Sequence, residues 1–369
     1  DALELVEVSQ RDPFAGPADP DLLAKTYDVP DDMYDPAIGE IDAERALDWA
    51  TRGERAARGF DERITNSDGS TFARTTGAFS MVLSGGFSGG YGVSMASLVV
   101  TPVADDDDNK KRRGFHWTAK RQFADLEAAE AVGEEAARRT VRLLGAKKVP
   151  SCEAPVIFDP DAARSIVGML AGCVTGTSLW KKQSYLQGRL GTRVASDLVN
   201  IVDDPLLPKG MATRPFDGEG LPSRKNVVVE NGILKSYLLD SYSGRKLEMP
   251  STASASRGGG GGVGPSSTNF VLQPTDTQAE DIIKDTERGL LVISMMGFGF
   301  NAVTGDFSRG ASGFWIENGE IVHPVNEVTI SLNVDDLYQR IDRIGDDLDL
   351  RTSTASPTIR VSSMTIAGS

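Results

Sequence analysis

Residues 297–302 read Gly-Phe-Gly-Phe-Asn-Ala, which fits the relaxed dinucleotide pattern G-x-G-x-x-A. This pattern binds a pyrophosphate only where a helix begins at the glycines and offers its N-terminal amides. The residues that follow, 303–310, have the composition of a turn and a strand rather than a helix. The context therefore favours glycines in a tight sheet crossing over a nucleotide site.

Residues 86–90 read Gly-Phe-Ser-Gly-Gly and match G-x-S-x-G, the nucleophile elbow of serine hydrolases. An elbow needs a strand, a sharp turn and a helix, together with a histidine base. The residues from Tyr91 onward read as another strand, and the chain has only two histidines, His116 and His323. A hydrolase centred on Ser88 is therefore disfavoured, and a Ser88→Ala exchange should leave any activity unchanged.

The remaining chemistry-bearing residues also favour structural roles. Cys173 lies late in an apolar segment, where a thiol stays protonated and inert. The pair Asp203-Asp204 precedes a proline, which is typical of a turn more than of an acid/base dyad. The two histidines are too far apart in the sequence to form a neighbouring zinc-ligand pair.

Periodicity places these residues in an α+β fold, with helices on a mixed sheet followed by a β-rich C-terminal domain. We expect helices over 42–58, 125–144 and 161–174. Asp125 would cap the second helix and Gly145 would end it.

Turn signals indicate three hairpins. An Asp-Gly turn predicts one over 64–73, and two Asn-Gly turns predict others over 227–239 and 313–325. The glycine run 258–262 predicts a mobile loop between the last two, because consecutive glycines do not hold a fixed conformation. We also expect a helix over 335–344 and a final strand over 358–367.

Composition excludes several classes of protein. The chain has 369 residues with 53 Asp and Glu against 39 Lys and Arg, a net charge of −14. This balance argues against nucleic acid as a main partner, because phosphate binding needs a basic face. Two cysteines exclude a disulfide framework, and no apolar run is long enough for a transmembrane helix. We expect a cytoplasmic protein without a membrane segment.

Several blocks of sequence, in order and over nearly the whole chain, resemble the TldD/PmbA family. The blocks are DPFAG at 12–16, VASDL at 194–198, DGEGLPSR at 217–224, TGDF at 304–307, GFWIENG at 313–319 and SMTIAG at 363–368. The resemblance implies an α/β N-terminal part over 1–150, truncated relative to the family, and a β-rich metalloprotease-like domain over 151–369.

The family contains zinc metallopeptidases that work as two-subunit assemblies. Its catalytic type carries H-E-x-x-x-H on a helix, where two histidines hold Zn²⁺ and the glutamate activates water, and a C-terminal cysteine adds a ligand. By this resemblance the ligand positions fall at about Val167, Gly168 and Gly172. Residues 350–357 contain no cysteine. The chain therefore resembles the PmbA/TldE type, which lacks its own metal motif.

The resemblance implies that this chain is the non-catalytic subunit of a cytosolic zinc metallopeptidase complex, and that the complex degrades or processes peptides or unfolded proteins. It implies no cofactor in this chain and zinc in a TldD-type partner. The alternative is a homodimeric peptide-binding protein without a proteolytic partner. The family's label as a modulator of DNA gyrase implies a nucleic-acid connection, which the acidic charge does not support as direct DNA binding. Candidate contacts for peptide or partner, against an interpretation as plain linker and core, are Gly258, Gly259, Gly260, Gly297, Phe298, Gly299, Phe300 and Asn301.

Overall fold

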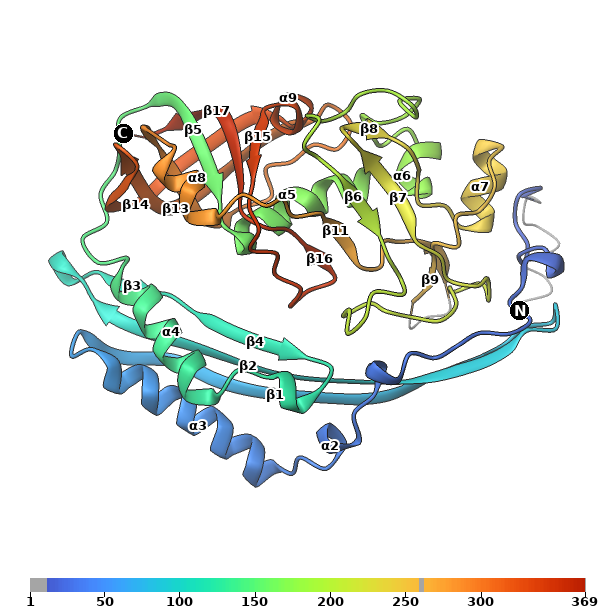
Figure 1. Ribbon diagram of the computed structural model, residues 1–369, viewed down its shortest axis with the longest axis horizontal. Coiled ribbons are helices and arrows are strands. Elements are labelled where there is room, and N and C mark those ends of the chain that lie inside the picture. The colour runs from blue at the N-terminus through green and yellow to red at the C-terminus, as the bar shows by residue number, and fades with distance from the viewer. Residues whose placement is uncertain (1–11, 259–261, 369) are drawn as a thin grey trace, which may run out of the picture.

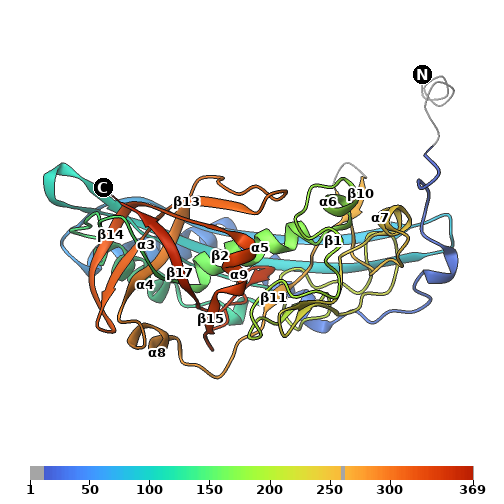
Figure 2. The ribbon, with the colours of Figure 1, turned by 90° about the horizontal axis from the view of Figure 1, so that it is seen from above.

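The computed structural model describes residues 12–258 and 262–368, and it forms two layers (Figure 1). In the lower layer of that view, two helices cover one face of a long antiparallel sheet. The upper layer holds two further sheets, of five and six strands. Seen from above, the long strands of the lower sheet run beneath most of the upper layer (Figure 2). The predicted α+β class is confirmed.

The two covering helices are α3 (Ala43–Phe60) and α4 (Ala129–Val141), which pack against each other. The helix predicted over 42–58 is confirmed as α3, and Asp42 caps it by accepting the amide of Arg45 at 2.8 Å. The second helix begins four residues later than predicted. The reason is that Asp125 closes a separate 3₁₀ turn, η4 (Phe123–Asp125).

The lower sheet is built on one long hairpin of β1 (Ile64–Val82) and β2 (Ser88–Asp105). The hairpin predicted over 64–73 is wrong, because Gly69 lies at a register shift within β1 and not at a turn. Its φ of 125° suits a bulge, which draws on glycine for the same steric reason as a turn does. Strands β3 (Lys111–Arg113) and β4 (His116–Lys120) both pair with β2.

The six-stranded sheet of the upper layer has the order β14-β13-β12-β5-β17-β15. An added β14–β17 pairing closes five of these strands into a ring and leaves β15 outside it. Its one parallel pairing is that of β5 with β12, so the sheet is mixed. The strands are β5 (Cys152–Phe158), β12 (Arg288–Met296), β13 (Asp306–Glu317), β14 (Glu320–Asn333), β15 (Ile341–Ile344) and β17 (Ile359–Ala367).

The five-stranded sheet has the order β16-β11-β6-β7-β8, with β11 and β16 parallel. Its strands are β6 (Ile201–Asp203), β7 (Asn226–Glu230), β8 (Ile233–Leu234), β11 (Phe270–Leu272) and β16 (Thr354–Ala355). Helix α5 (Pro160–Cys173) contacts strands of both sheets and shares the largest hydrophobic core with them.

Both predicted Asn-Gly hairpins are confirmed, at β7–β8 and β13–β14. Asn231 and Gly232 have φ of 47° and 75°, and Asn318 and Gly319 have φ of 52° and 78°. Two successive positive φ values are the requirement of the type I′ turn that joins twisted strands.

Shorter elements connect the sheets. They are η1 (Pro20–Leu22), η2 (Asp31–Met33), α2 (Pro36–Gly39), η3 (Asp107–Asn109), α6 (Gly176–Trp180), α7 (Ser241–Leu247), β9 (Ala255–Arg257), β10 (Val263–Pro265), α8 (Ala279–Lys284) and α9 (Val334–Gln339). The helix predicted over 335–344 is half wrong, because α9 ends at Gln339 and β15 follows. Over residues 12–258 and 262–368, the helices are all too short or too polar to cross a bilayer.

A glycine contact between α3 and α4 gives the first prediction. A Cβ on Gly133 would lie 2.1 Å from the carbonyl oxygen of Gly53, so Gly133→Ala must push the helices apart. Overpacking of this kind costs about 1–3 kcal/mol and outweighs the gain in helix propensity of about 1 kcal/mol. We expect a lower melting temperature by circular dichroism.

Gly59→Ala is the matched control, because a Cβ at this α3 position meets no atom within 4 Å. It should raise the melting temperature slightly through helix propensity. Equal or higher stability of Gly133→Ala would contradict the close helix crossing.

Candidate functional site

Helix α5 is fixed by a cap at its start and by burial along most of its length. Asp159 accepts the amide of Ala162 at 2.8 Å, and Pro160 opens the helix where its missing N–H costs nothing. At the far end, burial raises the pKa of the Cys173 thiol to about 11, which agrees with an inert structural cysteine.

A pocket of about 520 Å³ lies along one face of α5. From the helix it is lined by Ser165, Gly168 and Gly172, which follow one another at close to helical periodicity. From the six-stranded sheet it is lined by Phe300, before β13, and Arg309, on β13. The two glycines leave the helix backbone open to whatever enters the pocket.

Arg309 and Arg164 both line this α5 pocket, and Arg164 is paired with Asp161 at 3.4 Å. Arg309, on β13, donates from Nη1 to Ser165 Oγ at 3.2 Å, and its guanidinium lies 5.8 Å from the centre of the Phe307 ring. Its Nε is buried and has no hydrogen-bond partner in the part of the chain that the structure describes. Sequence reasoning missed this arginine, because nothing local in the strand distinguishes it from an exposed one.

The positions that the family resemblance assigned to metal ligands supply no ligand. Val167 is buried in the core, and Gly168 and Gly172 have no side chain to offer. Among the described residues there is no cluster of three or more His, Cys, Asp or Glu that could hold a metal ion. The described residues around α5 therefore do not fit a zinc ion.

The two histidines lie on different sheets. His116, on β4, is 3.1 Å from Glu127 through Nε2, and His323, on β14, is 3.0 Å from the Pro324 carbonyl oxygen through Nδ1. Neither faces Ser88, which begins strand β2 directly after a turn. Because β2 is a strand, the helix that a nucleophile elbow requires does not follow this serine.

The predicted contact segment 297–301 forms a protruding turn before β13. Gly297 has φ of 89°, and a Cβ on Gly299 would lie 1.6 Å from the Ser308 carbonyl oxygen, so both positions need glycine. Phe298 is 100% exposed, an unusual state for a large aromatic side chain. Asn301 closes the turn by accepting the amide of Val303 at 2.9 Å.

Only part of the predicted contact set comes together. Phe300 lines the α5 pocket, whereas Gly258 is an exposed residue directly after β9 and does not line it. Gly259 and Gly260 lie outside the described residues. No helix follows Gly297 and Gly299, since the next element is strand β13. The helix that a dinucleotide site requires at these glycines is therefore missing.

Asp203 and Asp204 have separate structural roles. Burial raises the pKa of Asp203 to about 6, while its Oδ1 accepts the amide of Thr268 at 2.5 Å and the hydroxyl of Thr268 at 3.0 Å. Asp204 accepts the amide of Leu206 at 3.0 Å. Asp203 thus joins β6 to the segment before β11, and Asp204 stabilises the turn after β6. The two residues do not form an acid/base dyad.

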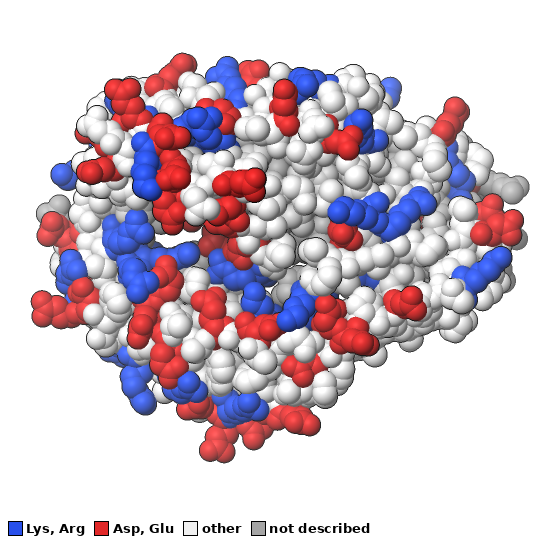
Figure 3. All heavy atoms as spheres, viewed as in Figure 1, with Lys and Arg blue, Asp and Glu red and all other residues white. Residues whose placement is uncertain are grey.

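A hollow between the two layers is bordered by Lys and Arg side chains (Figure 3). The basic residues that line a pocket of about 510 Å³ there are Lys111, Arg112, Arg113 and Arg139. Arg112 is paired with Asp106 at 2.5 Å, and Arg139 with Asp161 at 3.2 Å. The positive charge of the hollow is thus partly neutralised from within the chain.

The matches to known proteins extend over almost the whole chain. Residues 36–144 match the profile of the PmbA/TldA metallopeptidase central domain, and residues 151–368 match that of the PmbA/TldA metallopeptidase C-terminal domain. Metalloprotease PmbA of Escherichia coli O157:H7 is 37% identical over 368 residues, covering 100% of this chain and 79% of the relative. The Metalloprotease PmbA homolog of Haemophilus influenzae is 37% identical over 369 residues, with the same coverage.

A crystal structure from Bacteroides thetaiotaomicron, of a protein described as a candidate modulator of DNA gyrase, has a similar fold. It superimposes with a TM-score of 0.91 at 27% sequence identity and covers 100% of this chain and 81% of that one.

The raised pKa of Asp159, which caps α5, should make the stability of the protein depend on pH. Burial raises the pKa of Asp159 from 3.8 to about 7, so between pH 4 and 7 the folded state holds a proton that the unfolded state releases. The free energy of unfolding therefore falls as pH rises through this window. Asp159→Asn keeps a capping side chain without the charge, and we expect it to be more stable than wild type at pH 8, by up to about 4 kcal/mol.

Melting temperatures of both proteins from pH 4 to 8 test this, and the two curves should approach each other toward pH 4. Asp42→Asn, the same exchange at the exposed cap of α3, controls for replacing a carboxylate cap by an amide. Parallel curves for wild type and Asp159→Asn would contradict the assignment.

Proposed function

This chain belongs to the PmbA/TldD metallopeptidase family, and we propose that it is the non-catalytic subunit of a cytosolic zinc-peptidase assembly. In this proposal a TldD-type subunit carrying H-E-x-x-x-H supplies the zinc, and this chain completes the assembly and helps to hold an extended peptide. We also propose the division into residues 1–150 and a peptidase-like domain over 151–369.

One observation carries the proposal. The face of α5 that borders the pocket has glycines at the positions where an H-E-x-x-x-H helix would have side chains that coordinate zinc. Gly168 and Gly172 cannot coordinate a cation, and Val167 faces the core. A zinc site needs three protein ligands even when it is catalytic and keeps one open position. The same bare backbone is compatible with close approach of a peptide or a partner segment.

The long edge of the lower sheet supports the peptide-holding role. Among the described residues, β1 pairs with β2 alone, so one side of this 19-residue strand is unpaired. An extended peptide can add to such an edge through main-chain hydrogen bonds, which do not depend on the peptide's sequence. This mode suits a protein that handles unfolded segments of many kinds.

Metal content and activity of separate and mixed chains test the proposal. We expect this chain alone to contain no stoichiometric zinc and to cleave no peptide. The sister chain with H-E-x-x-x-H should bind zinc, and mixing should give full cleavage of an unfolded peptide. The matched control is a sister chain in which the glutamate of H-E-x-x-x-H is changed to glutamine. Its mixture with this chain should not cleave the peptide.

Stoichiometric zinc together with peptidase activity in this chain alone would overturn the proposal. Recovery only as a homodimer, in cells that also contain the sister chain, would favour the alternative of a peptide-binding protein without a proteolytic partner.

The exposed turn 297–301 gives a prediction about assembly. Phe298→Ser should weaken association with the sister chain at least tenfold in analytical ultracentrifugation, because a fully exposed phenyl ring gains most from burial at an interface. The melting temperature should not change. Val82→Ser is the control, since Val82 is 80% exposed at the β1–β2 turn, away from this segment. Equal effects of the two exchanges would exclude the turn as the contact.

A further inference from the structure

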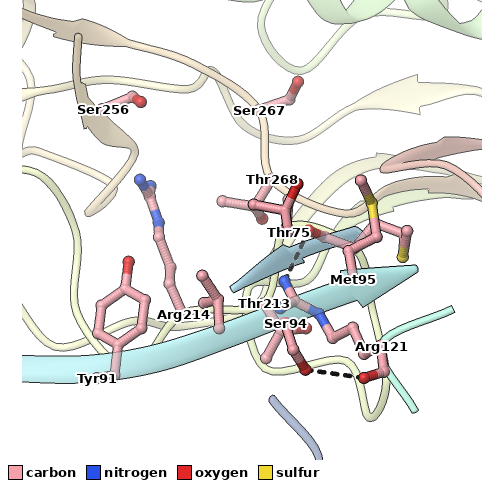
Figure 4. Close-up of a pocket in the computed structure, with 13 residues that line it drawn as sticks. Thr75, Tyr91, Ser94, Met95, Arg121, Thr213, Arg214, Ser256, Ser267 and Thr268 are labelled. Atoms are coloured by element: carbon pink, nitrogen blue, oxygen red, sulfur yellow. Dashed lines mark hydrogen bonds between the residues drawn. The ribbon is translucent and has the colours of Figure 1, made fainter. Parts of the chain in front are cut away.

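A third pocket, of about 360 Å³, lies where the lower sheet meets the five-stranded part of the upper layer (Figure 4). Strand β2 contributes Tyr91 and Ser94, and β9 contributes Ser256. Thr268 enters from the connection before β11. The lining is therefore rich in hydroxyl groups, which can donate hydrogen bonds without carrying charge. We call this cavity the Arg214 pocket, after the residue that stands in it.

Two arginines line the Arg214 pocket, and one of them is fully engaged. Arg121 donates from Nε to the Gly210 carbonyl oxygen at 2.6 Å and from Nη2 to the Met211 carbonyl oxygen at 2.7 Å. These bonds hold the segment before Arg214 against the end of β4. Arg121 is thus a structural residue that adds positive charge to the pocket wall.

Arg214 is not engaged in this way. Its Nε and Nη2 are buried and have no hydrogen-bond partner among residues 12–258 and 262–368. In Figure 4 its side chain stands beside Tyr91 and extends toward Ser256. A buried donor without a partner costs about 1–3 kcal/mol, and more where the group is charged. The folded chain tolerates this cost at a position that faces a cavity.

The unpartnered atoms are the pair that binds carboxylates elsewhere in this protein. Arg52 uses Nε and Nη2 to hold both oxygens of Glu130, at 2.7 and 2.9 Å. Arg360 holds Asp342 with the same two atoms, at 3.0 and 2.9 Å. This edge of a guanidinium matches the two oxygens of a carboxylate in a bidentate bond. In Arg214 the same edge is buried beside an open cavity.

The chain's own carboxylates do not fill this place. Asp217 and Asp203 attract Arg214 electrostatically. No carboxylate oxygen of the described residues, however, lies within 4.0 Å of a guanidinium nitrogen of Arg214, the distance that an ion pair requires. Asp217 is held by the amides of Leu221 at 2.9 Å and Ala255 at 3.2 Å. Because two acidic groups lie near, a singly charged anion is favoured over a phosphate dianion.

We propose that the Arg214 pocket binds the C-terminal carboxylate of a peptide, with Nε and Nη2 of Arg214 as the bidentate donors. The choice of a peptide as the carrier rests on the proposed function, whereas the choice of a carboxylate rests on Arg214 alone. The neighbouring hydroxyls and the open mouth of the pocket would accommodate the last residue of the peptide.

Calorimetric titration of the full chain, without a sister chain, tests this with an acetylated tripeptide and its C-terminal amide. We expect the acid to bind at least tenfold more tightly than the amide. Arg214→Met should reduce binding of the acid at least tenfold. It should also melt no lower than wild type, because it removes a charge without a partner. Arg58→Met, an exposed arginine on α3, is the control and should change neither quantity.

Equal binding of acid and amide, or full binding by Arg214→Met, would overturn the proposal. A melting temperature lowered by several degrees in Arg214→Met would show a structural arginine instead. Acetate and inorganic phosphate are the remaining probes. If acetate binds and the peptide acid does not, the peptide is not the ligand. If phosphate binds more tightly than the peptide acid, the pocket does not prefer a carboxylate. Because no zinc subunit is present, failure here is distinct from failure of the proposed assembly.

Discussion

The burial of α5 between two sheets is the constraint on which the account of this protein depends. The helix shares one hydrophobic core with both C-terminal sheets, so its rotation about its own axis is fixed by packing. That rotation directs Val167 into the core and leaves Gly168 and Gly172 at the surface of the α5 pocket. Any chemistry at this surface must therefore come from the neighbouring elements, from a ligand or from another chain.

Two of the pockets that border the C-terminal sheets share one feature, an arginine with buried donor atoms that have no hydrogen-bond partner in the described part of the chain. Arg309 has one such atom, Nε, beside α5, and Arg214 has two, Nε and Nη2, beside β2. Arg52 and Arg360, by contrast, each hold a carboxylate. Among the described residues, the unpartnered donor atoms of Arg214 and Arg309 give two cavities a local attraction for anionic groups, although the net charge of the protein is −14.

The sequence predicted those elements whose signals are local. The Asn-Gly hairpins at 231–232 and 318–319 were predictable because the type I′ turn is specified by two adjacent residues. The Asp-Gly pair at 68–69 gave a wrong hairpin because a bulge in a continuous strand needs the same glycine, and only the partner strand distinguishes the two. Helix α4 begins late because Asp125 belongs to a separate 3₁₀ turn, which periodicity alone does not separate from the helix.

The site residues divide along the same line. The lack of metal ligands on α5 was readable from the sequence, because the types of side chain decide it. Arg214 and Arg309 were not, because an arginine becomes a candidate only when its surroundings bury it and offer no partner. The surroundings of Arg214 come from β2, which lies far from it in the sequence, and from β9 and the segment before β11.

Anomalous diffraction at the zinc absorption edge, from crystals of this chain with the sister chain that is proposed to bind zinc, is the most direct test of the proposed division of roles. We expect an anomalous peak on the H-E-x-x-x-H helix of the sister chain and none beside Gly168 and Gly172 of α5. A peak held by side chains of this chain would contradict that division.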